Sequence, residues 1–599
     1  MKNRNFWLSL CIWGVVSASN ANSVSNAMNK LINHTDPNIN MGMMVVDLTT
    51  GNTLYEHQSH QLMSPASNMK LFSQAAAMLA LGPEYEIPTT LSTDAKTLTQ
   101  GRLNGSLYIH LPADPSFSHQ ALFSLLNKLQ SLGVREITGD VVIQSDLMVA
   151  SPYPPGMTPR DEQYSYGAPV APLILDENRL TVIVNPASKV GLPAVVETLS
   201  PQGVFEIDNQ VMTRDNPKGC GVSVTLDEMG KIHAKGCVVG GQMALQFKTP
   251  IKHSVAYFAD HVRYKFQQTG IAFHGNVRLG HMPASTIELS RHYSKPLRHL
   301  MGLTLKPSDN LYANALYLLA ANDIRHAPSN WTQAQDAVRQ FLQQQTGINF
   351  ANAVFGDGSG LSRFNRVSAY QTMSLLTYFY DKFPIAYEYI SALPISGFDG
   401  TLKRRLNQPF QKGMIRAKTG TMTGIYSLSG YLITKNRHTL AFTIYINRRA
   451  DGKSRMRGSY RDFIDQICSL LLKSEPSNLH HPLFYYAATN PLNKRPTAIE
   501  VSRRQLISWR NLEYLLKKDL RSQPVTVVYH QNELLVLDND NHDSVIWSAI
   551  KKLKNNRNIG VAVESVQAPN LGSDALNFLW VQKPPLAHYQ RVWIIRSKG

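Results

Sequence analysis

The sequence predicts a multidomain α+β protein in which helices flank an antiparallel sheet. At 599 residues the chain is too long for a single hydrophobic core. Residues 41–47 and 53–57 have strand patterns, and a run of three further strands follows between 413 and 447. The apolar face of a helix at 460–472 would pack on that sheet. Between these parts, residues 92–289 contain mainly short strands punctuated by Gly and Asn, which indicates an inserted, mostly β module.

The N-terminal residues have the pattern of a secretory signal peptide. Lys2 and Arg4 precede an apolar run at residues 6–16, and Ser19-Asn20-Ala21 is a small-x-small cleavage site. Eleven apolar-rich residues are too few to cross a bilayer, which argues against a retained anchor. We therefore expect residues 1–21 to be removed after Ala21 and the mature protein to be exported and soluble.

The cysteines suit an oxidising compartment. Cys220 and Cys237 flank a strand-like stretch with a turn in its middle, an arrangement that suits a disulfide across a hairpin. Cys468 lies on the apolar face of the predicted helix at 460–472, so we expect it to be a buried free thiol.

The net charge of +18 indicates an anionic partner. No nucleic-acid module is recognisable and the chain is expected to be exported, so we expect no nucleic-acid partner. Anionic cell wall or anionic lipid headgroups fit better. Residues 482–599 carry 16 Lys and Arg against 9 Asp and Glu, and they follow a linker predicted at 475–481. They are expected to form a separate, basic α+β domain.

Two segments of the insertion resemble each other weakly. Predicted helices near residues 119–132 and 254–268 are each followed by Gly, a strand, a second Gly and another strand, as LGVREITGDVVIQ and TGIAFHGNVRLG. The similarity indicates that one small structural unit occurs twice in this region.

Ser67 and Lys70 lie at the start of a predicted helix. Residues 71–81 are rich in helix formers, and Ser64 and Pro65 stand where an N-cap and a first-turn proline would. A spacing of three places Lys70 on the same helix face as Ser67. The helix N-terminus directs unpaired N–H groups at the serine oxygen, which suits a nucleophile that must become negative. A solvated Ser and Lys on an ordinary helix is the alternative that this motif alone leaves open.

Two further motifs follow in the chain. Ser308-Asp309-Asn310 opens a predicted helix at 310–322, and Lys418-Thr419-Gly420 ends a predicted strand at 414–418. Ser-x-x-Lys, Ser-x-Asn and Lys-Thr-Gly in this order form the active-site set of the penicillin-recognising serine enzymes. The glycine-rich segment 356–360 lacks the Lys of a phosphate-binding loop, so we interpret it as a tight structural turn.

The chain resembles the D-alanyl-D-alanine carboxypeptidase/endopeptidase family, the low-molecular-mass class C penicillin-binding proteins of penicillin-binding protein 4 type. The segments PSDNLYANAL, DGSGLSRFNRVS, LPISGFDGTLKRR and RAKTGTMTGIYSLSGY carry the resemblance, which runs from about residue 41 to residue 472. It implies a transpeptidase-like catalytic domain formed by residues 22–91 and 290–474 and interrupted by the inserted module. It also implies a periplasmic serine-type D-Ala-D-Ala carboxypeptidase that acts on peptidoglycan stem peptides and is acylated by β-lactams.

The resemblance implies that the catalytic residues are Ser67, Lys70, Ser308 and Lys418 and that Asn310 binds substrate. Ser67 would attack the D-Ala–D-Ala carbonyl, and Lys70 would accept its proton if burial and repulsion from Lys418 lower the lysine pKa. Ser308 would pass the proton to the leaving amine, bridging the two lysines. Asn310 would hold the substrate amide and orient Lys70.

Further residues would bind the substrate. Lys418, within the Lys-Thr-Gly motif that includes Gly420, would bind the terminal carboxylate together with the hydroxyls of Thr419 and Thr421. The backbone N–H groups of Ser67 and Thr421 would form the oxyanion hole. Asp161 aligns with the family's pocket acid, which meets the free amine of diaminopimelate. A solvated loop carboxylate is the equal alternative for Asp161.

Two other functions bear on the chain. It could be a catalytically weak penicillin-binding or wall-binding protein whose basic C-terminal domain does the main work. It could be a β-lactamase, although no Glu-x-x-Leu-Asn pattern lies between Asn310 and Lys418. The histidines show no His-Glu-x-x-His spacing, so we expect no metal site and no cofactor.

Overall fold

The structure is a computed structural model. It describes residues 24–36, 39–147, 149–201, 204–227, 230–382, 385–448 and 459–476, and four strands between 526 and 597. The chain divides into two compact units, Met1–Leu375 with Ala392–Phe484 and Leu376–Ser391 with Tyr485–Gly599. Among the described residues, no helix combines the length and the apolar character that crossing a membrane requires.

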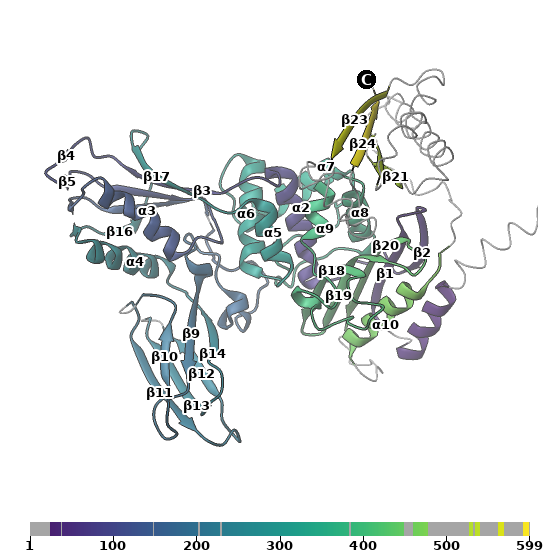
Figure 1. Ribbon diagram of the computed structural model, residues 1–599, viewed down its shortest axis with the longest axis horizontal. Coiled ribbons are helices and arrows are strands. Elements are labelled where there is room, and N and C mark those ends of the chain that lie inside the picture. The colour runs from purple at the N-terminus through teal and green to yellow at the C-terminus, as the bar shows by residue number, and fades with distance from the viewer. Residues whose placement is uncertain are drawn as a thin grey trace, which may run out of the picture. The chain divides into compact units, whose positions relative to one another are not determined.

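The first unit contains a five-stranded antiparallel sheet (Figure 1). Its strands in spatial order are β18 (Ile415–Met422), β19 (Ile425–Ile433), β20 (Thr439–Asn447), β1 (Met41–Asp47) and β2 (Asn52–His57). The predicted strands are therefore present, but the Lys418 motif lies inside β18 and not at its end. Pairing continues to Met422 opposite Ile425, because the two-residue turn containing Gly424 closes the β18–β19 hairpin directly.

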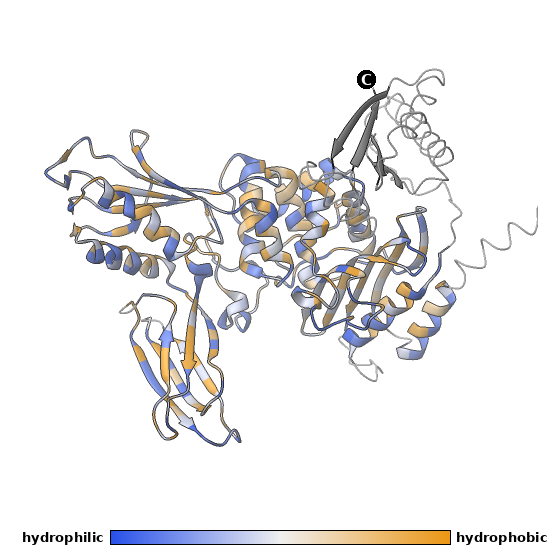
Figure 2. Cartoon of the chain, in the orientation of Figure 1, coloured by the Kyte–Doolittle hydropathy of each residue, from blue (hydrophilic) through white to orange (hydrophobic). Residues whose placement is uncertain are grey.

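Two helices cover one face of this sheet. Residues 24–35, which the sequence did not lead us to expect as a helix, and α10 (Tyr460–Lys473) share a hydrophobic core with the sheet. The amphipathic pattern of α10 is visible in Figure 2. Cys468 is buried in this core as a free thiol, as predicted. Alternate residues of β20 point away, and Tyr445 Oη lies 2.6 Å from Thr372 Oγ1 on α8 (Ala369–Tyr380).

A bundle of helices surrounds α2 (Met69–Leu81). The three helices that pack on α2 are α5 (Leu297–Leu305), α6 (Asn310–Arg325) and α7 (Trp331–Thr346). Burial on all sides explains why α2 is apolar around most of its circumference. The expected N-cap is wrong: Ser64 Oγ is buried and bonds to no group among the described residues. Asn447 instead accepts from Ser64 N at 2.9 Å and donates to Ser64 O at 3.0 Å, which holds the serine backbone away from a capping position.

The inserted region begins and ends with paired strands. β3 (Pro88–Thr93) pairs with β17 (Ile287–Tyr293) at the edge of a five-stranded sheet of order β16-β8-β6-β3-β17. The remaining elements are β4 (Leu98–Thr99), β5 (Arg102–Leu103), β6 (Leu107–Leu111), α3 (His119–Ser131), β7 (Glu136–Ile137), β8 (Val141–Ser145), α4 (Ser254–Thr269), β15 (Ala272–Phe273) and β16 (Val277–Leu279). The limits 92 and 289 remain a prediction, since these outer strands reach beyond them.

The two similar segments lie side by side. β15 pairs in parallel with β7, and β16 pairs in parallel with β8, so each helix–strand–strand segment continues the sheets of the other. A Cβ added to Gly275 would lie 2.2 Å from Gly139 O, and this close approach explains the glycine that both segments carry between their strands. The predicted internal similarity is confirmed.

A second part of the insertion consists of two three-stranded sheets. One contains β9 (Arg179–Asn185), β10 (Val195–Thr198) and β14 (Leu245–Pro250), and the other β11 (Ile207–Arg214), β12 (Val222–Leu226) and β13 (Ile232–Val239). The hairpin β12–β13 carries a disulfide between Cys220 and Cys237, whose Cα atoms lie 5.2 Å apart. The pairing suggested by the sequence is therefore present.

The second unit contains α9 (Ile385–Ser391) and a four-stranded antiparallel sheet. Its strands are β21 (Thr526–His530), β22 (Glu533–Asp538), β23 (Val561–Gln567) and β24 (Arg591–Ser597). The sequence assigned residues 376–391 to the catalytic part, whereas they group with these strands. The predicted linker at 475–481 and the rest of the C-terminal segment lie largely outside the described residues.

Candidate active site

Ser67 lies on a tight turn that leads into α2. The turn is the 3-10 helix η1 (Ala66–Asn68), so the serine precedes the α-helix instead of occupying its first turn. Ala66 has φ 46°, a left-handed conformation that is unfavourable for a residue with a Cβ. The side chain of Ser67 is partly accessible, and Lys70 Nζ lies 3.1 Å from its Oγ. The first pair of the predicted site residues is therefore in contact.

The amine of Lys70 has three acceptors. Besides Ser67 it donates to Asn310 Oδ1 at 2.6 Å and to the carbonyl oxygen of Ser359 at 2.7 Å. The side chain is fully buried. Burial lowers the pKa of Lys70 to about 7, although the nearby carboxylates of Asp357 and Asp309 oppose the shift. A substantial fraction of the amine is thus neutral near neutral pH and able to accept a proton.

Lys418 and Ser308 form the second contact of the site. Lys418 Nζ donates to Ser308 Oγ at 2.8 Å and to the carbonyl oxygen of Thr419 at 2.9 Å. Lys418 is fully buried, and burial together with the charge of Lys70 lowers its pKa well below the ordinary lysine value. Ser308 occupies the turn between α5 and α6 with φ 65°, which fixes its hydroxyl beside β18.

β18 runs directly against η1, the turn that carries Ser67, which is named the nucleophile turn below after the expected role of that serine. A Cβ added to Gly420 would lie 3.0 Å from Ser67 N and 2.1 Å from Ser427 Oγ, so only glycine fits there. Thr419 Oγ1 donates to Thr401 Oγ1 at 2.7 Å, and the side chain of Thr421 is exposed. β18 is an edge strand: an isolated bridge joins Ile395 to Arg416, and no described strand pairs with its outer edge beyond that point.

Asp161 is connected to Asn310 through hydrogen bonds of Tyr166. Its carboxylate accepts from Thr158 Oγ1 at 2.6 Å and from Tyr166 Oη at 2.9 Å. The carbonyl oxygen of Tyr166 in turn accepts from Asn310 Nδ2 at 2.8 Å. Tyr166 stacks on Tyr164 with ring centroids 5.3 Å apart, and both rings are more than two-fifths exposed. Asp161 thus belongs to a partly exposed aromatic loop tied to the Ser-x-Asn motif.

Sequence reasoning missed the role of the glycine-rich segment. It is a tight turn, as expected, but it also contributes Ser359 O to Lys70. Buried Asp357 organises the turn, because its carboxylate accepts from Ser359 Oγ at 2.5 Å and from Gly360 N at 2.8 Å. Gly360 has φ 93°, and a Cβ there would lie 2.0 Å from Ala66 O. The spacing of the glycines around Asp357 was the signal available in the sequence.

Arg179 was also missed. It lies on β9 in the insertion, and its guanidinium contacts both oxygens of Asp309, at 2.5 and 3.2 Å. The Arg179 side chain is only 5% exposed. Asp309 simultaneously caps α6 by accepting from Tyr312 N at 3.1 Å. The insertion therefore holds the start of the helix that carries Asn310, a link between residues 130 positions apart.

The chain is similar to known carboxypeptidases. A model of the D-Ala-D-Ala carboxypeptidase 3 (S13) family matches residues 24–466. The D-alanyl-D-alanine carboxypeptidase DacB of Haemophilus influenzae is 29% identical over 427 residues, which cover 69% of this chain and 86% of that protein. A D-alanyl-D-alanine carboxypeptidase of an Actinomadura species is 29% identical over 423 residues, 68% of this chain and 77% of that protein.

The chain is also similar to solved structures. The crystal structure of penicillin binding protein 4 (dacB) from Haemophilus influenzae matches with a TM-score of 0.64 and 26% identity, over 74% of this chain and 99% of the other. A crystal structure of the same protein complexed with a β-lactam matches with a TM-score of 0.59, also at 26% identity, over 74% of this chain and 99% of the other.

Proposed function

The chain belongs to the D-Ala-D-Ala carboxypeptidase 3 (S13) family, and from this we propose that it is a serine carboxypeptidase that cleaves peptidoglycan stem peptides through an acyl-enzyme on Ser67. One observation carries the assignment of the nucleophile. The Ser67 hydroxyl contacts a fully buried lysine amine whose pKa is lowered to about 7, a pair in which the amine acts as base.

In the proposed reaction Lys70 is the base, and Ser308, which is held by Lys418, passes the proton on. Neutral Lys70 takes the proton of Ser67 Oγ as the oxygen attacks the carbonyl carbon of the D-Ala–D-Ala bond. Backbone N–H groups of Ser67 and Thr421 stabilise the resulting oxyanion. The proton then passes through Ser308 to the departing D-Ala nitrogen, and the C–N bond breaks. In the second step a water molecule gives one proton to Lys70 as its oxygen attacks the acyl carbon, and Lys70 returns that proton to Ser67 Oγ as the acyl C–O bond breaks.

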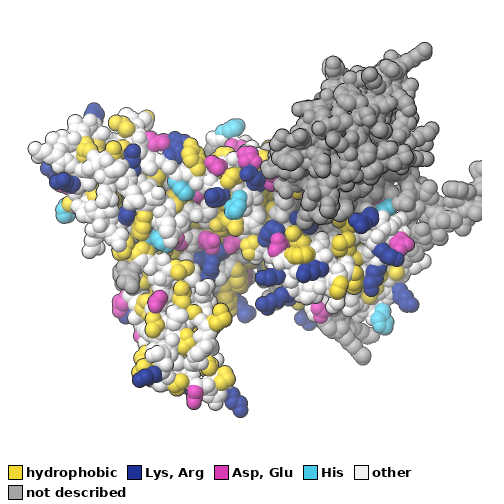
Figure 3. Space-filling model, in the orientation of Figure 1, with side chains coloured by type: hydrophobic (Ala, Val, Ile, Leu, Met, Phe, Trp, Pro, Cys, Tyr) yellow, Lys and Arg dark blue, Asp and Glu magenta, His cyan; other side chains and the backbone are white. Residues whose placement is uncertain are grey.

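The terminal carboxylate of the substrate would be bound at β18. Lys418, Thr419 and Thr421 offer a cation and two hydroxyls near the nucleophile turn, and an arriving carboxylate favours the protonated form of Lys418. The outer edge of β18 could pair with the peptide backbone of the substrate as an added strand, with Gly420 leaving room beside Ser67. Figure 3 shows Lys and Arg side chains grouped beside β18 and β19, which favours an anionic ligand at this part of the surface.

Asp161 is proposed as the acceptor for the free amine of diaminopimelate. Its carboxylate is partly exposed, and the exposed rings of Tyr164 and Tyr166 would cover the aliphatic stem of that side chain. The Tyr166 carbonyl contact to Asn310 gives the pocket a direct connection to the catalytic residues.

Cleavage of D-Ala from stem peptides and cleavage of cross-links between them need the same acyl-enzyme and differ in the leaving amine. β-lactams are proposed as acylating inhibitors of Ser67, since the related Haemophilus protein was crystallised with one. A β-lactamase is disfavoured because no glutamate is among the described hydrogen-bond partners of Ser67 and Lys70, and the sequence has no Glu-x-x-Leu-Asn pattern between Asn310 and Lys418.

Location and anchoring complete the proposal. Export to the periplasm follows from the signal pattern of residues 1–21, and the basic residues 482–599 would hold the enzyme near anionic wall polymer or lipid. The competing function is a catalytically weak penicillin-binding protein that acts mainly through this C-terminal segment. Measuring substrate turnover distinguishes the two functions.

The test compares the full-length protein with Ser67→Ala and Ser64→Ala. Fluorescent penicillin should label the wild type and Ser64→Ala, whose lost hydroxyl bonds to no described group, but not Ser67→Ala. Purified muropeptides should release D-Ala or separate into monomers with the first two proteins only. Labelling of folded Ser67→Ala would contradict the nucleophile, and labelling without turnover in the wild type would favour the receptor.

A further inference from the structure

A cluster of two histidines and an aspartate lies in the insertion and includes none of the residues proposed for catalysis. His119 begins α3, Asp176 belongs to the 3-10 turn η4 (Asp176–Asn178), and His261 lies on α4. One side-chain ligand atom from each of the three lies within 4.8 Å of the others. His119 Nδ1 is 2.9 Å from Asp176 Oδ2, so two of the three groups already touch.

The third group, His261, has a free ring nitrogen. Its Nδ1 lies 2.8 Å from the carbonyl oxygen of Tyr257, which can only accept, so Nδ1 carries the proton. Nε2 is therefore a lone-pair acceptor, and it has no hydrogen-bond partner among the described residues although the side chain is fully buried. A buried acceptor without a donor is costly, and a bound cation would satisfy it.

The surroundings match the outer shell of a metal site. Metal-binding histidines usually donate their second N–H to a carbonyl or carboxylate, as His261 does to Tyr257. Asp176 is oriented by two further donors, Tyr257 Oη at 2.7 Å and His119 N at 3.0 Å. Ser200 Oγ lies 3.0 Å from the Tyr257 hydroxyl and completes the chain of hydrogen bonds. His261 and Asp176 are thus each oriented by a group outside the three proposed ligand atoms.

We propose that His119 Nδ1, a carboxylate oxygen of Asp176 and His261 Nε2 bind a divalent transition metal of the zinc class. Two imidazole nitrogens and one carboxylate oxygen are a ligand set that zinc accepts in tetrahedral sites with water as the fourth ligand. Zinc–nitrogen bonds place neighbouring ligand atoms roughly 3.3 Å apart. The His119–Asp176 pair at 2.9 Å would therefore open slightly, and the wider separations, which reach up to 4.8 Å, would close around the ion. The metal would take the place of the hydrogen bond between His119 Nδ1 and Asp176.

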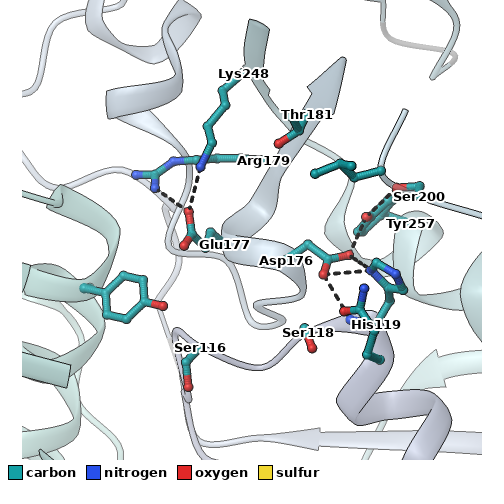
Figure 4. A pocket seen from close by; sticks show the side chains of 13 residues that line it. Ser116, Ser118, His119, Asp176, Glu177, Arg179, Thr181, Ser200, Lys248 and Tyr257 are labelled. Atoms are coloured by element: carbon teal, nitrogen blue, oxygen red, sulfur yellow. Dashed lines mark hydrogen bonds and ion pairs between the residues drawn. The ribbon is translucent and has the colours of Figure 1, made fainter. Parts of the chain in front are cut away.

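A cavity of about 250 Å³ borders the cluster on the side of His119 and Asp176, while His261 lies behind its lining (Figure 4). His119, Asp176, Tyr257 and Ser200 line it, and Figure 4 shows Asp176 between His119 and Tyr257. The fourth coordination position would face this cavity, where water or a small anionic ligand could occupy it. Arg179 and Lys248 line the same cavity and would favour the anion.

The backbone at the cluster is constrained. Asp176, Glu177 and Asn178 have φ values of 50°, 60° and 48°, three consecutive non-glycine residues in the left-handed region. Such strain persists only where the surrounding contacts enforce it. A metal bound to Asp176 would tie this turn to α3 and α4, and the chain then continues within three residues to Arg179, the partner of Asp309. The metal is thus expected to stabilise the insertion and not to take part in acylation.

The test uses the full-length protein stripped with a chelator. Titration with Zn²⁺ against a chromophoric competitor should show a tight site, and Co²⁺ in its place should give the visible d–d bands of a four-coordinate site. His261→Gln and His119→Gln should each weaken the site by more than about 100-fold, beyond the upper end for a lost outer-shell partner. Tyr257→Phe, which removes only an outer-shell donor, should weaken it about 10- to 100-fold.

His233→Gln is the matched control. His233 also contacts two carboxylates, but through opposite ring nitrogens, Nδ1 to Asp208 at 3.1 Å and Nε2 to Asp227 at 2.9 Å, so they cannot converge on one ion. This variant should bind Zn²⁺ as the wild type does. Fluorescent-penicillin labelling of every variant shows that the catalytic part is folded.

Results of two kinds would overturn the proposal, one from a variant and one from the wild type. The first is equal Zn²⁺ affinity of the wild type and His261→Gln, which would place any bound zinc elsewhere. The second needs no variant: X-ray absorption of the zinc-loaded wild type must show two imidazole ligands. A spectrum without imidazole, or no tight site in the stripped protein, contradicts the assignment.

Discussion

Lys70 is the residue on which the proposed chemistry depends most directly. Its amine donates to Ser67, Asn310 and the Ser359 carbonyl. The oxygens of Asn310 and Ser359 serve at the amine only to hold it in position. Acceptors favour the charged amine whereas burial favours the neutral one, and burial prevails in lowering the pKa to about 7. The amine is therefore fixed by three hydrogen bonds, and part of it is still neutral near pH 7.

The acylation rate should depend on pH through Lys70. Because the amine must be neutral to accept a proton, the second-order rate of penicillin acylation should rise with pH and level off above about 7. Below that pH the rate should fall about tenfold per unit, as the protonated fraction grows. Stopped-flow measurement from pH 5.5 to 9 checks this. A flat profile, or a midpoint near the ordinary lysine pKa, would remove Lys70 as the base.

Asp161→Asn should reduce discrimination for diaminopimelate. Loss of a charged partner costs about 1.5–3 kcal/mol, or one to two decades in kcat/KM, for peptides with the free amine. Peptides with that amine acetylated should be affected little. Glu162→Gln, a neighbouring carboxylate on the same 3-10 turn, is the control. Equal losses on both peptides would make Asp161 a structural residue of the Tyr166 loop.

At the scale of elements, the site is assembled from chain segments that approach one another through glycines. Gly360 faces Ala66, and Gly420 faces Ser67, in each case with no space for a Cβ. The nucleophile turn is therefore enclosed between the glycine-rich turn and β18. Its strained Ala66 conformation is maintained by these two contacts.

Gly360→Ala should disrupt the nucleophile turn. The added Cβ would lie 2.0 Å from Ala66 O in a backbone with φ 93°, so either the turn or the segment must move. Because misplacement by about 1 Å can cost 100-fold in rate, penicillin labelling should slow by at least tenfold. Gly302→Ala on α5, where a Cβ meets nothing, should label normally. Normal labelling of Gly360→Ala would show that the turn adapts freely.

Arg179→Ala should weaken both the fold and the site. The change leaves the Asp309 carboxylate, 17% exposed, without its guanidinium partner and should cost about 2 kcal/mol of unfolding free energy. The start of α6 should loosen, and with it Asn310, so acylation should slow as well. Arg278→Ala is the control, because its pair with Asp140 is half exposed and worth less than about 1 kcal/mol. Equal melting temperatures for the two variants would contradict the coupling.

The limits of sequence reasoning follow from the same contacts. Ser67, Lys70, Ser308 and Lys418 were predictable because each belongs to a short motif at a recognisable helix or strand. Arg179 and Asp357 were not, since their roles arise from partners brought together by the fold. His119, Asp176 and His261 show no ligand spacing because they come from three separate elements. Local pattern indicated the groups that we propose to react, whereas the residues that support them could be found only from the structure.

At the scale of the whole molecule, the contacts of the catalytic residues all lie in one of the two units. Every described partner of Ser67, Lys70 and Lys418 falls within Met1–Leu375 or Ala392–Phe484. The second unit contains the sheet β21–β24 and α9. Its contribution is therefore expected to lie outside the chemical step.

Deleting residues 482–599 should leave penicillin acylation intact and reduce retention on anionic surfaces. A Lys or Arg near such a surface contributes about 1 kcal/mol, screened by salt. Sedimentation of full-length and truncated protein with isolated sacculi and with anionic liposomes, at low and high salt, measures the effect. Equal retention at both salt concentrations would end the tethering hypothesis. Loss of acylation would show that residues 376–391 need the deleted segment to keep their conformation.

The order of strands in the catalytic sheet determines when the enzyme can become active during its synthesis. β1 and β2 are synthesised early, yet β1 pairs with β20. Asn447 at the end of β20 also hydrogen-bonds the backbone of Ser64, 383 residues away in the sequence. A ribosome delivers the chain from its N-terminus, so the whole insertion emerges before these partners exist. Closing so long a loop delays sheet formation until late. The turn that positions Ser67 therefore does not form in nascent chains. Truncated translation products should not react with penicillin.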